Sequence, residues 1–127
     1  MKKTKLILIL LVCTAPYFSL AQDFKNRIVL GEKNARQAIK EAINNKNYKP
    51  FYDTLITDRE MAIEIVEPIL FKIYGKENIV SERPYECYLI EGYWYICGTL
   101  PKDWKGGVFE IIISSKDGKV IELTHGK

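Results

Sequence analysis

The chain has 127 residues, of which 47% are hydrophobic, and a formal net charge of +3. This length makes one domain, and the hydrophobic share is enough to bury a core without a metal or several disulfides. The small charge argues against a general nucleic-acid binder, because such a protein needs a strongly basic surface to release counterions from phosphates. We therefore expect no nucleic-acid partner.

The first 21 residues have the pattern of a secretory signal peptide. A basic start at residues 1–5 precedes an apolar run at residues 6–12, and the small side chains of Ser19 and Ala21 suit cleavage before Gln22. The apolar stretch is interrupted too early to span a bilayer, so cleavage is favoured over a membrane anchor. The sequence predicts an exported protein, periplasmic or extracellular, with no stable membrane insertion after cleavage.

Two amphipathic helices are predicted next along the chain. In residues 33–45, apolar side chains return at helical spacing with polar ones between them. A second helix is expected to begin at Thr57, whose hydroxyl can form a capping box with Glu60, to kink at Pro68 and to end at Gly75. The apolar face predicted for this second helix consists of Ala62, Ile65, Val66, Ile69, Leu70 and Ile73.

The hydrophobic period changes from helical to alternating after Gly75, which predicts an antiparallel meander. The four expected strands are residues 84–90, 93–100, 108–115 and 119–124. A turn at residues 116–118 joins the last two strands and places Ile113 opposite Ile121. The sequence therefore predicts an α+β fold, with N-terminal helices packed on a curved antiparallel sheet. Residues 22–56 and 57–127 are expected to form one compact domain.

Two cysteines, Cys87 and Cys97, remain after the predicted cleavage, in a compartment where a disulfide can persist. A hairpin turn at Glu91–Gly92 pairs residue 87 with residue 96, so the two cysteine side chains point to opposite faces of the sheet. We expect two thiols, with Cys87 buried.

The face of the predicted sheet that points away from the helices carries tyrosines and carboxylates. Tyr88, Tyr93 and Tyr95 lie there with Glu110. One interpretation is a half-exposed face on which tyrosines form cross-strand pairs. The other is a recognition surface, because tyrosine gives a large contact area with few rotatable bonds. Trp104 is expected to cover the core as a lid, and as an exposed residue it would be a further contact anchor. These five are the candidate partner-binding residues.

A set of short motifs resembles one bacterial protein family. The motifs are residues 67–70 (Glu-Pro-Ile-Leu), 73–75 (Ile-Tyr-Gly), 82–84 (Glu-Arg-Pro), 92–95 (Gly-Tyr-Trp-Tyr), 98–101 (Gly-Thr-Leu-Pro), 104 (Trp), 106–108 (Gly-Gly-Val) and 117–120 (Asp-Gly-Lys-Val). Over roughly residues 57–124, the chain resembles the immunity proteins with a nuclear transport factor 2-like fold. The resemblance implies a cone-like α+β architecture, nuclear transport factor 2-like or cystatin-like. It also implies a role in polymorphic toxin systems of bacteria, where an immunity protein binds and neutralises a cognate toxin.

The sequence contains no pattern typical of a catalytic, cofactor-binding or metal-binding site, so we expect neither enzyme activity nor a cofactor. His125 is the only histidine and lies near the C-terminus, where chains commonly fray. His-x-x-x-His and Cys-x-x-Cys spacings do not occur. Two alternatives remain: an inhibitory or ligand-binding domain of the cell envelope, and a pocket isomerase with Glu110 or Glu86 as its base.

Overall fold

The computed structural model describes residues 26–127. The expected signal peptide and its cleavage site therefore lie outside the described residues. The chain divides into two compact units, Met1–Asn47 and Tyr48–Lys127, and each is described by itself. No helix within residues 26–127 combines the length and apolar character needed to cross a membrane.

The described part of the first unit is built around one helix, α1 (Gly31–Asn44), which confirms the helix expected at residues 33–45. Side chains one turn apart stabilise it. Arg36 pairs with Glu32, and the Gln37 amide donates to Glu41. None of its residues is buried. The expectation of one compact domain with residues 57–127 stays a prediction for this helix.

Helix α2 (Arg59–Tyr74) begins the helical part of the second unit. Its N-cap is Asp58, whose carboxylate accepts from the backbone N–H of Met61 at 2.8 Å. The expected cap at Thr57 is wrong by one residue, because the aspartate, itself a strong N-cap, has the extended backbone that this position requires. Pro68 lies inside the helix as predicted, and Gly75 ends it with a φ of 88°.

A short helix, α3 (Lys76–Ser81), follows directly, where the sequence predicted a change to strand. Six residues are too few to show a helical period. The helix is fixed by burial of Ile79 and by the Asn78 side chain, which donates to the carbonyl of Tyr74 at 2.8 Å.

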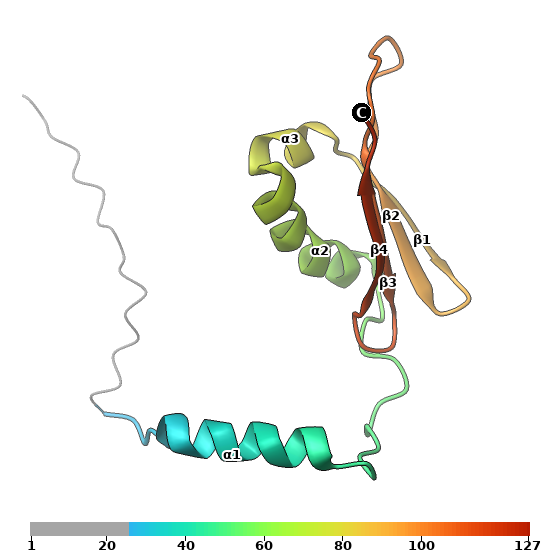
Figure 1. Ribbon diagram of the computed structural model, residues 1–127. Helices are drawn as coiled ribbons and strands as arrows, with labels where there is room; N and C mark the ends of the chain where they lie inside the picture. The colour runs from blue at the N-terminus through green and yellow to red at the C-terminus, as the bar shows by residue number, and fades with distance from the viewer. Residues whose placement is uncertain (1–25) are drawn as a thin grey trace, which may run out of the picture. The chain divides into compact units, whose positions relative to one another are not determined.

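The remaining chain forms an antiparallel sheet in the order β1-β2-β3-β4 (Figure 1), which confirms the predicted meander. The strands are β1 (Glu86–Ile90), β2 (Tyr93–Cys97), β3 (Phe109–Ser114) and β4 (Val120–His125). The pairing of Cys87 with Ile96 is as predicted. At the second hairpin, however, Ile113 pairs with Val120 and not with Ile121, because the register shifts between Ile112 and Ile113.

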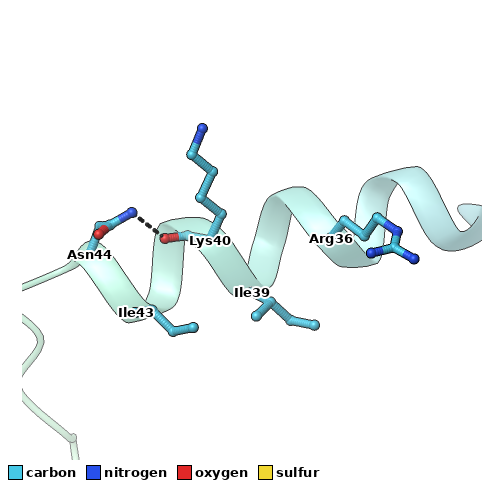
Figure 2. Close-up of a pocket in the computed structure, with 5 residues that line it drawn as sticks. All are labelled: Arg36, Ile39, Lys40, Ile43 and Asn44. Carbon is cyan, nitrogen blue, oxygen red and sulfur yellow. Dashed lines mark hydrogen bonds between the residues drawn. The ribbon is translucent and has the colours of Figure 1, made fainter.

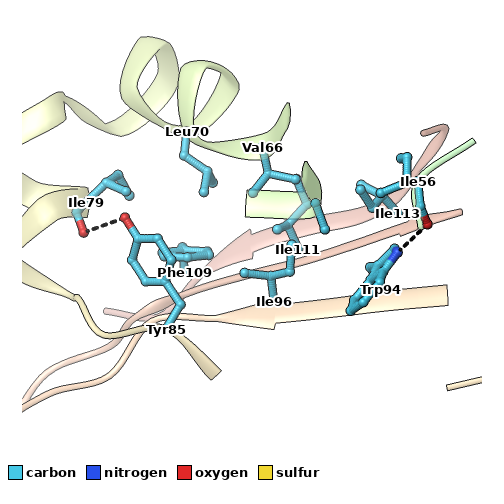
Figure 3. Packing of buried hydrophobic residues seen from close by; sticks show 11 residues of the cluster. Ile56, Val66, Leu70, Ile79, Tyr85, Trp94, Ile96, Phe109, Ile111 and Ile113 are labelled. Atoms are coloured by element: carbon cyan, nitrogen blue, oxygen red, sulfur yellow. Dashed lines mark hydrogen bonds between the residues drawn. The ribbon is translucent and has the colours of Figure 1, made fainter. Parts of the chain in front are cut away.

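The core lies between α2 and one face of the sheet (Figure 3). Val66 and Leu70 of α2 meet Ile111 and its neighbours on the central strands. The fully buried large side chains are Phe109, Ile56, Leu70, Ile79, Ile96, Ile111, Ile113 and Val66. The buried stripe of α2 is narrower than predicted, since Ile69 is 36% exposed and Ile65 and Ile73 are also exposed. The core side of the two central strands is as predicted, whereas the apolar face predicted for α2 is wider than its buried stripe.

Candidate partner-binding face

Alternation along the four strands leaves the second side of the sheet free of the core. We call this side the open face, and its strand positions are Glu86, Tyr88, Ile90, Tyr93, Tyr95, Cys97, Glu110, Ile112, Ser114, Glu122 and Thr124. Four of the five predicted partner-binding residues, Tyr88, Tyr93, Tyr95 and Glu110, therefore lie on one surface. The register explains this, because Tyr88 pairs directly with Tyr95 across the first two strands.

Two tyrosines of the open face, Tyr88 and Tyr95, are held in place by each other and by carboxylates. The rings of Tyr88 and Tyr95 stack with centroids 6.4 Å apart. The Tyr95 hydroxyl donates to Oε2 of Glu110 at 2.6 Å, and the Tyr88 hydroxyl lies 3.5 Å from Oε1 of Glu86. The hydrogen bond to the Glu110 carboxylate raises the pKa of Tyr95 well above its ordinary value. This hydroxyl is therefore a neutral donor, and its ring has a fixed orientation.

A hollow of about 360 Å³ lies beside the stacked rings. Its lining residues are Ile90, Glu91, Tyr93, Tyr95, Ile112 and Ile121. Ile121 was predicted on the core side opposite Ile113, and that placement is wrong. The register shift leaves Ile121 outside the ladder, 50% exposed and beside Ile112. The run Ile111-Ile112-Ile113 already indicates that the middle isoleucine points outward, whereas no sequence signal locates the bulge.

The charges on the open face are all of one sign. Its strand positions include Glu86, Glu110 and Glu122, and none of them is lysine or arginine. Glu91 adds a fourth carboxylate at the edge of the hollow. An apolar and aromatic centre is thus bordered by acidic groups.

Trp104 lies apart from this surface. It belongs to the loop between β2 and β3, whereas the Glu91–Gly92 turn is at the opposite end of β2 (Figure 1). The indole is 68% exposed, so the predicted lid over the core is wrong. Its backbone N–H donates to the carbonyl of Pro101 in a turn, which presents the side chain to solvent.

His125 is not frayed, contrary to the expectation for a residue so near the C-terminus. Its Nε2 lies 2.8 Å from Oε1 of Glu82, and its Nδ1 lies 2.6 Å from the carbonyl of Gly126. The buried Glu82 also accepts from the backbone N–H of Phe109 at 2.8 Å. Both ring nitrogens thus face oxygen acceptors, an arrangement that suits the protonated imidazolium. This ion pair ties the C-terminal end of β4 to the residue that follows α3, and the same carboxylate holds the start of β3.

A second hollow, also of about 360 Å³, runs along α1 (Figure 2). Arg36, Ile39, Lys40, Ile43 and Asn44 line it, and the Asn44 amide donates to the carbonyl of Lys40 at 2.8 Å. All of these residues come from one helix. A binding site normally needs polar groups that converge from several elements, so this hollow has the character of a helix surface.

Cys87 and Cys97 are free thiols. Burial raises the pKa of both, which reduces the fraction of reactive thiolate. Within residues 26–127, no three side chains among His, Cys, Asp and Glu are grouped in a way that could hold a metal ion.

The comparisons with known proteins agree with this architecture. A family model described as "NTF2 fold immunity protein" matches residues 61–127, and the chain belongs to this family. The resemblance seen in the motifs is thereby confirmed, and with it the fold class.

Two relatives are proteins of Escherichia coli (strain K12). The uncharacterized protein YhhH is 34% identical over 74 residues, which are 58% of this chain and 58% of that protein. The uncharacterized protein YbbC is 35% identical over 68 residues, which are 53% of this chain and 56% of that protein. The chain thus matches little more than half the length of either relative. No solved structure matches the chain.

Proposed function

We propose that this chain is an exported, non-catalytic immunity protein that neutralises a cognate bacterial toxin by binding it through the open face. The observation that carries the proposal is the stacked pair Tyr88 and Tyr95, fixed by Glu110 on a surface that the core of residues 48–127 does not use. Membership of the immunity protein family supplies the class of partner.

Rigid aromatic side chains suit this role for a physical reason. Binding costs free energy for every flexible side chain that it immobilises, and a tyrosine that is already held loses little on binding. The three tyrosines of the open face, Tyr88, Tyr93 and Tyr95, are about half exposed or less. The exposed part of each ring offers contact area, and the rest of the side chain packs on the sheet. The open face therefore has the properties of a preorganised contact surface.

The geometry favours binding over catalysis. A pocket isomerase needs a carboxylate in a cavity that excludes water. Glu110 instead lies on an exposed sheet face and accepts a hydrogen bond from Tyr95, and Glu86 is exposed on the edge strand β1. Neither carboxylate has the enclosed surroundings that a base of that kind requires.

The test begins with the neighbouring genes, one of which we expect to encode the toxin, and then measures protection from that toxin; an isolated gene would favour the alternative of an envelope inhibitory or ligand-binding domain. The toxin is directed to the periplasm of a host cell, with the full chain or with a version lacking residues 1–21. We expect the full chain to restore growth and the leaderless version to fail. Protection by neither version, when both are present as folded protein, would contradict the immunity function. Equal protection by the two versions would contradict the exported site of action.

A further inference from the structure

We infer that the open face binds a basic segment of its partner. An apolar side chain of that segment fills the hollow, and its lysine or arginine side chains pair with the surrounding carboxylates. The inference rests on the proposed function, and it adds the chemistry of the partner.

The charge pattern carries the first step. Glu86 and Glu122 lie on the two edge strands, Glu110 lies between them on β3, and the strand positions of this face include no cation that would neutralise them. Complementary charges guide the approach of a partner and exclude wrong partners. A segment with cations on both sides of an apolar residue therefore matches the surface.

The hydrogen bonds carry the second step. Glu110 uses Oε2 to accept from Tyr95, which holds the carboxylate and leaves Oε1 to accept from a cation of the partner. Glu86 is oriented by Tyr88 in the same manner, at the longer distance of 3.5 Å. Glu110 is thus positioned before binding, so fewer rotamers have to be frozen when its ion pair forms.

The hollow carries the third step. Tyr93 and Tyr95 of β2 lie between Ile90 of β1 and the pair Ile112 and Ile121, and Glu91 is the only charged residue of the lining. Such a lining favours an apolar side chain. The carboxylates lie around this centre, so ion pairs would form the rim of the interface.

Charge also selects among possible occupants. Two copies of this chain that met through their open faces would bring like carboxylates together, which is unfavourable. Nucleic acid and anionic lipid surfaces are disfavoured for the same reason. A basic protein segment is the occupant that the surface fits.

The experiment measures, at low and at high salt, the Kd between the purified exported chain and the toxin that we expect a neighbouring gene to encode. The double variant Glu86→Gln with Glu122→Gln removes two charges from the open face. Its matched control, Glu64→Gln with Glu77→Gln, removes two exposed charges from α2 and α3. We expect the first pair to weaken binding by about tenfold at low salt and to reduce its salt dependence, as the loss of two exposed ion pairs would. The control pair should change neither the Kd at low salt nor its dependence on salt.

The hollow is tested with Ile121→Ala against Ile73→Ala. The two isoleucines are 50% and 54% exposed, and Ile73 lies on α2, away from the open face. We expect Ile121→Ala to weaken binding by roughly 15- to 60-fold, because two to three buried methylene equivalents are lost, and Ile73→Ala to have no effect. Thermal melts of all variants separate loss of binding from loss of folding.

The outcomes distinguish a failure of the basic-segment inference from a failure of the immunity function. Wild-type chain that binds the toxin with a Kd insensitive to salt and to all of these variants overturns the basic-segment inference and leaves the immunity function standing. Wild-type chain that neither binds the toxin nor protects against it overturns the immunity function. A dimer in sedimentation that Ile121→Ala dissociates would assign the open face to a second copy and also overturn the inference.

Discussion

Tyr95 belongs to the proposed contact surface and not to the core of the fold. Its ring stacks on Tyr88 and its hydroxyl donates to Glu110, yet none of the three belongs to the hydrophobic core. Its contribution to stability should therefore be small compared with its contribution to a contact.

We expect Tyr88→Ala and Tyr95→Ala to weaken toxin binding by about 2 kcal/mol or more each, which is tens-fold in Kd. The melting curves should stay close to that of the wild type. Tyr48→Ala, at an exposed tyrosine outside the sheet, is the matched control. Calorimetric titration and thermal melts decide the matter. If the open-face variants bind normally, or bind poorly only because they unfold, this face is scaffold.

His125 makes stability depend on pH. Burial lowers its pKa, but the bonds to the Gly126 carbonyl and the Glu82 carboxylate raise it, and the net shift is upward. The folded state therefore holds the proton more tightly than the unfolded state. The stabilisation is fully present below the unfolded pKa of about 6.5 and is lost as the pH rises through the folded value.

Denaturant unfolding on both sides of neutral pH checks this prediction. The wild type should lose stability between mildly acidic and alkaline conditions, and His125→Gln should lose much less over the same range. The Glu82→Gln variant removes the carboxylate that stabilises the protonated His125 ring. It should reduce the pH dependence of the unfolding free energy in the same way. A wild-type profile identical to that of His125→Gln would show that the ion pair does not contribute.

At the scale of elements, the contact of α2 with β3 determines whether the second unit folds. Leu70 and Ile111 are fully buried, whereas Ile69 on the neighbouring helix position is 36% exposed. An aspartate at a fully buried position leaves a charge without a partner.

Leu70→Asp and Ile111→Asp should therefore abolish the cooperative melt, at a cost of about 4 kcal/mol or more. Ile69→Asp should be milder, because its carboxylate can reach water, and Lys116→Ala in the exposed turn should be near neutral. Circular dichroism melts of the four proteins rank them. A melt of Ile111→Asp as mild as that of Lys116→Ala would contradict the assignment of the core face.

The elements that sequence reasoning identified are those encoded by neighbouring residues. Helical spacing located α1 and α2, and the turn at Glu91–Gly92 fixed the first hairpin and its register. The open-face tyrosines followed from alternation alone. The short helix α3 was missed because it is held by packing of a single buried residue, Ile79, and its period cannot be read.

The features that were missed depend on residues far apart in the chain or on backbone detail. Glu82 and His125 are separated by 43 residues, and only the finished sheet brings them together. The position of Ile121 depends on the register shift at Ile112, which local turn signals do not encode. The exposure of Trp104 depends on the path of the loop between β2 and β3, which the sequence does not reveal. The prediction of a lid rested on the hydrophobic side chain alone. The error in each case concerns placement and not residue chemistry.

At the scale of the whole molecule, the two units have different characters. The second unit contains the buried core and the whole of the family match, whereas the described part of the first has no buried helix residue. Export depends on the predicted signal peptide at residues 1–21, and it stays a prediction.

Intact-mass measurement of the protein recovered from outside the cytoplasm tests the export. We expect a chain that begins at Gln22, because Ser19 and Ala21 provide the small residues that signal peptidase requires. A mutant with Ala21→Asp should retain its leader and serves as the control. Recovery of a wild-type species that still carries residues 1–21 would rule the prediction out.

Alternation in the sheet also has an evolutionary consequence. On the central strands β2 and β3, every second residue, such as Ile111 or Ile113, is buried in the core, while the residues between them, such as Glu110 and Ile112, are not. Substitutions on the open face can then change binding specificity with little loss of folding stability. A library randomised only at Glu86, Tyr88 and Glu122 should consist largely of folded proteins, from which selection could draw immunity to toxins that the present surface does not match. If the proposed toxin changes its sequence, a fold of this kind allows the contact surface to change with it.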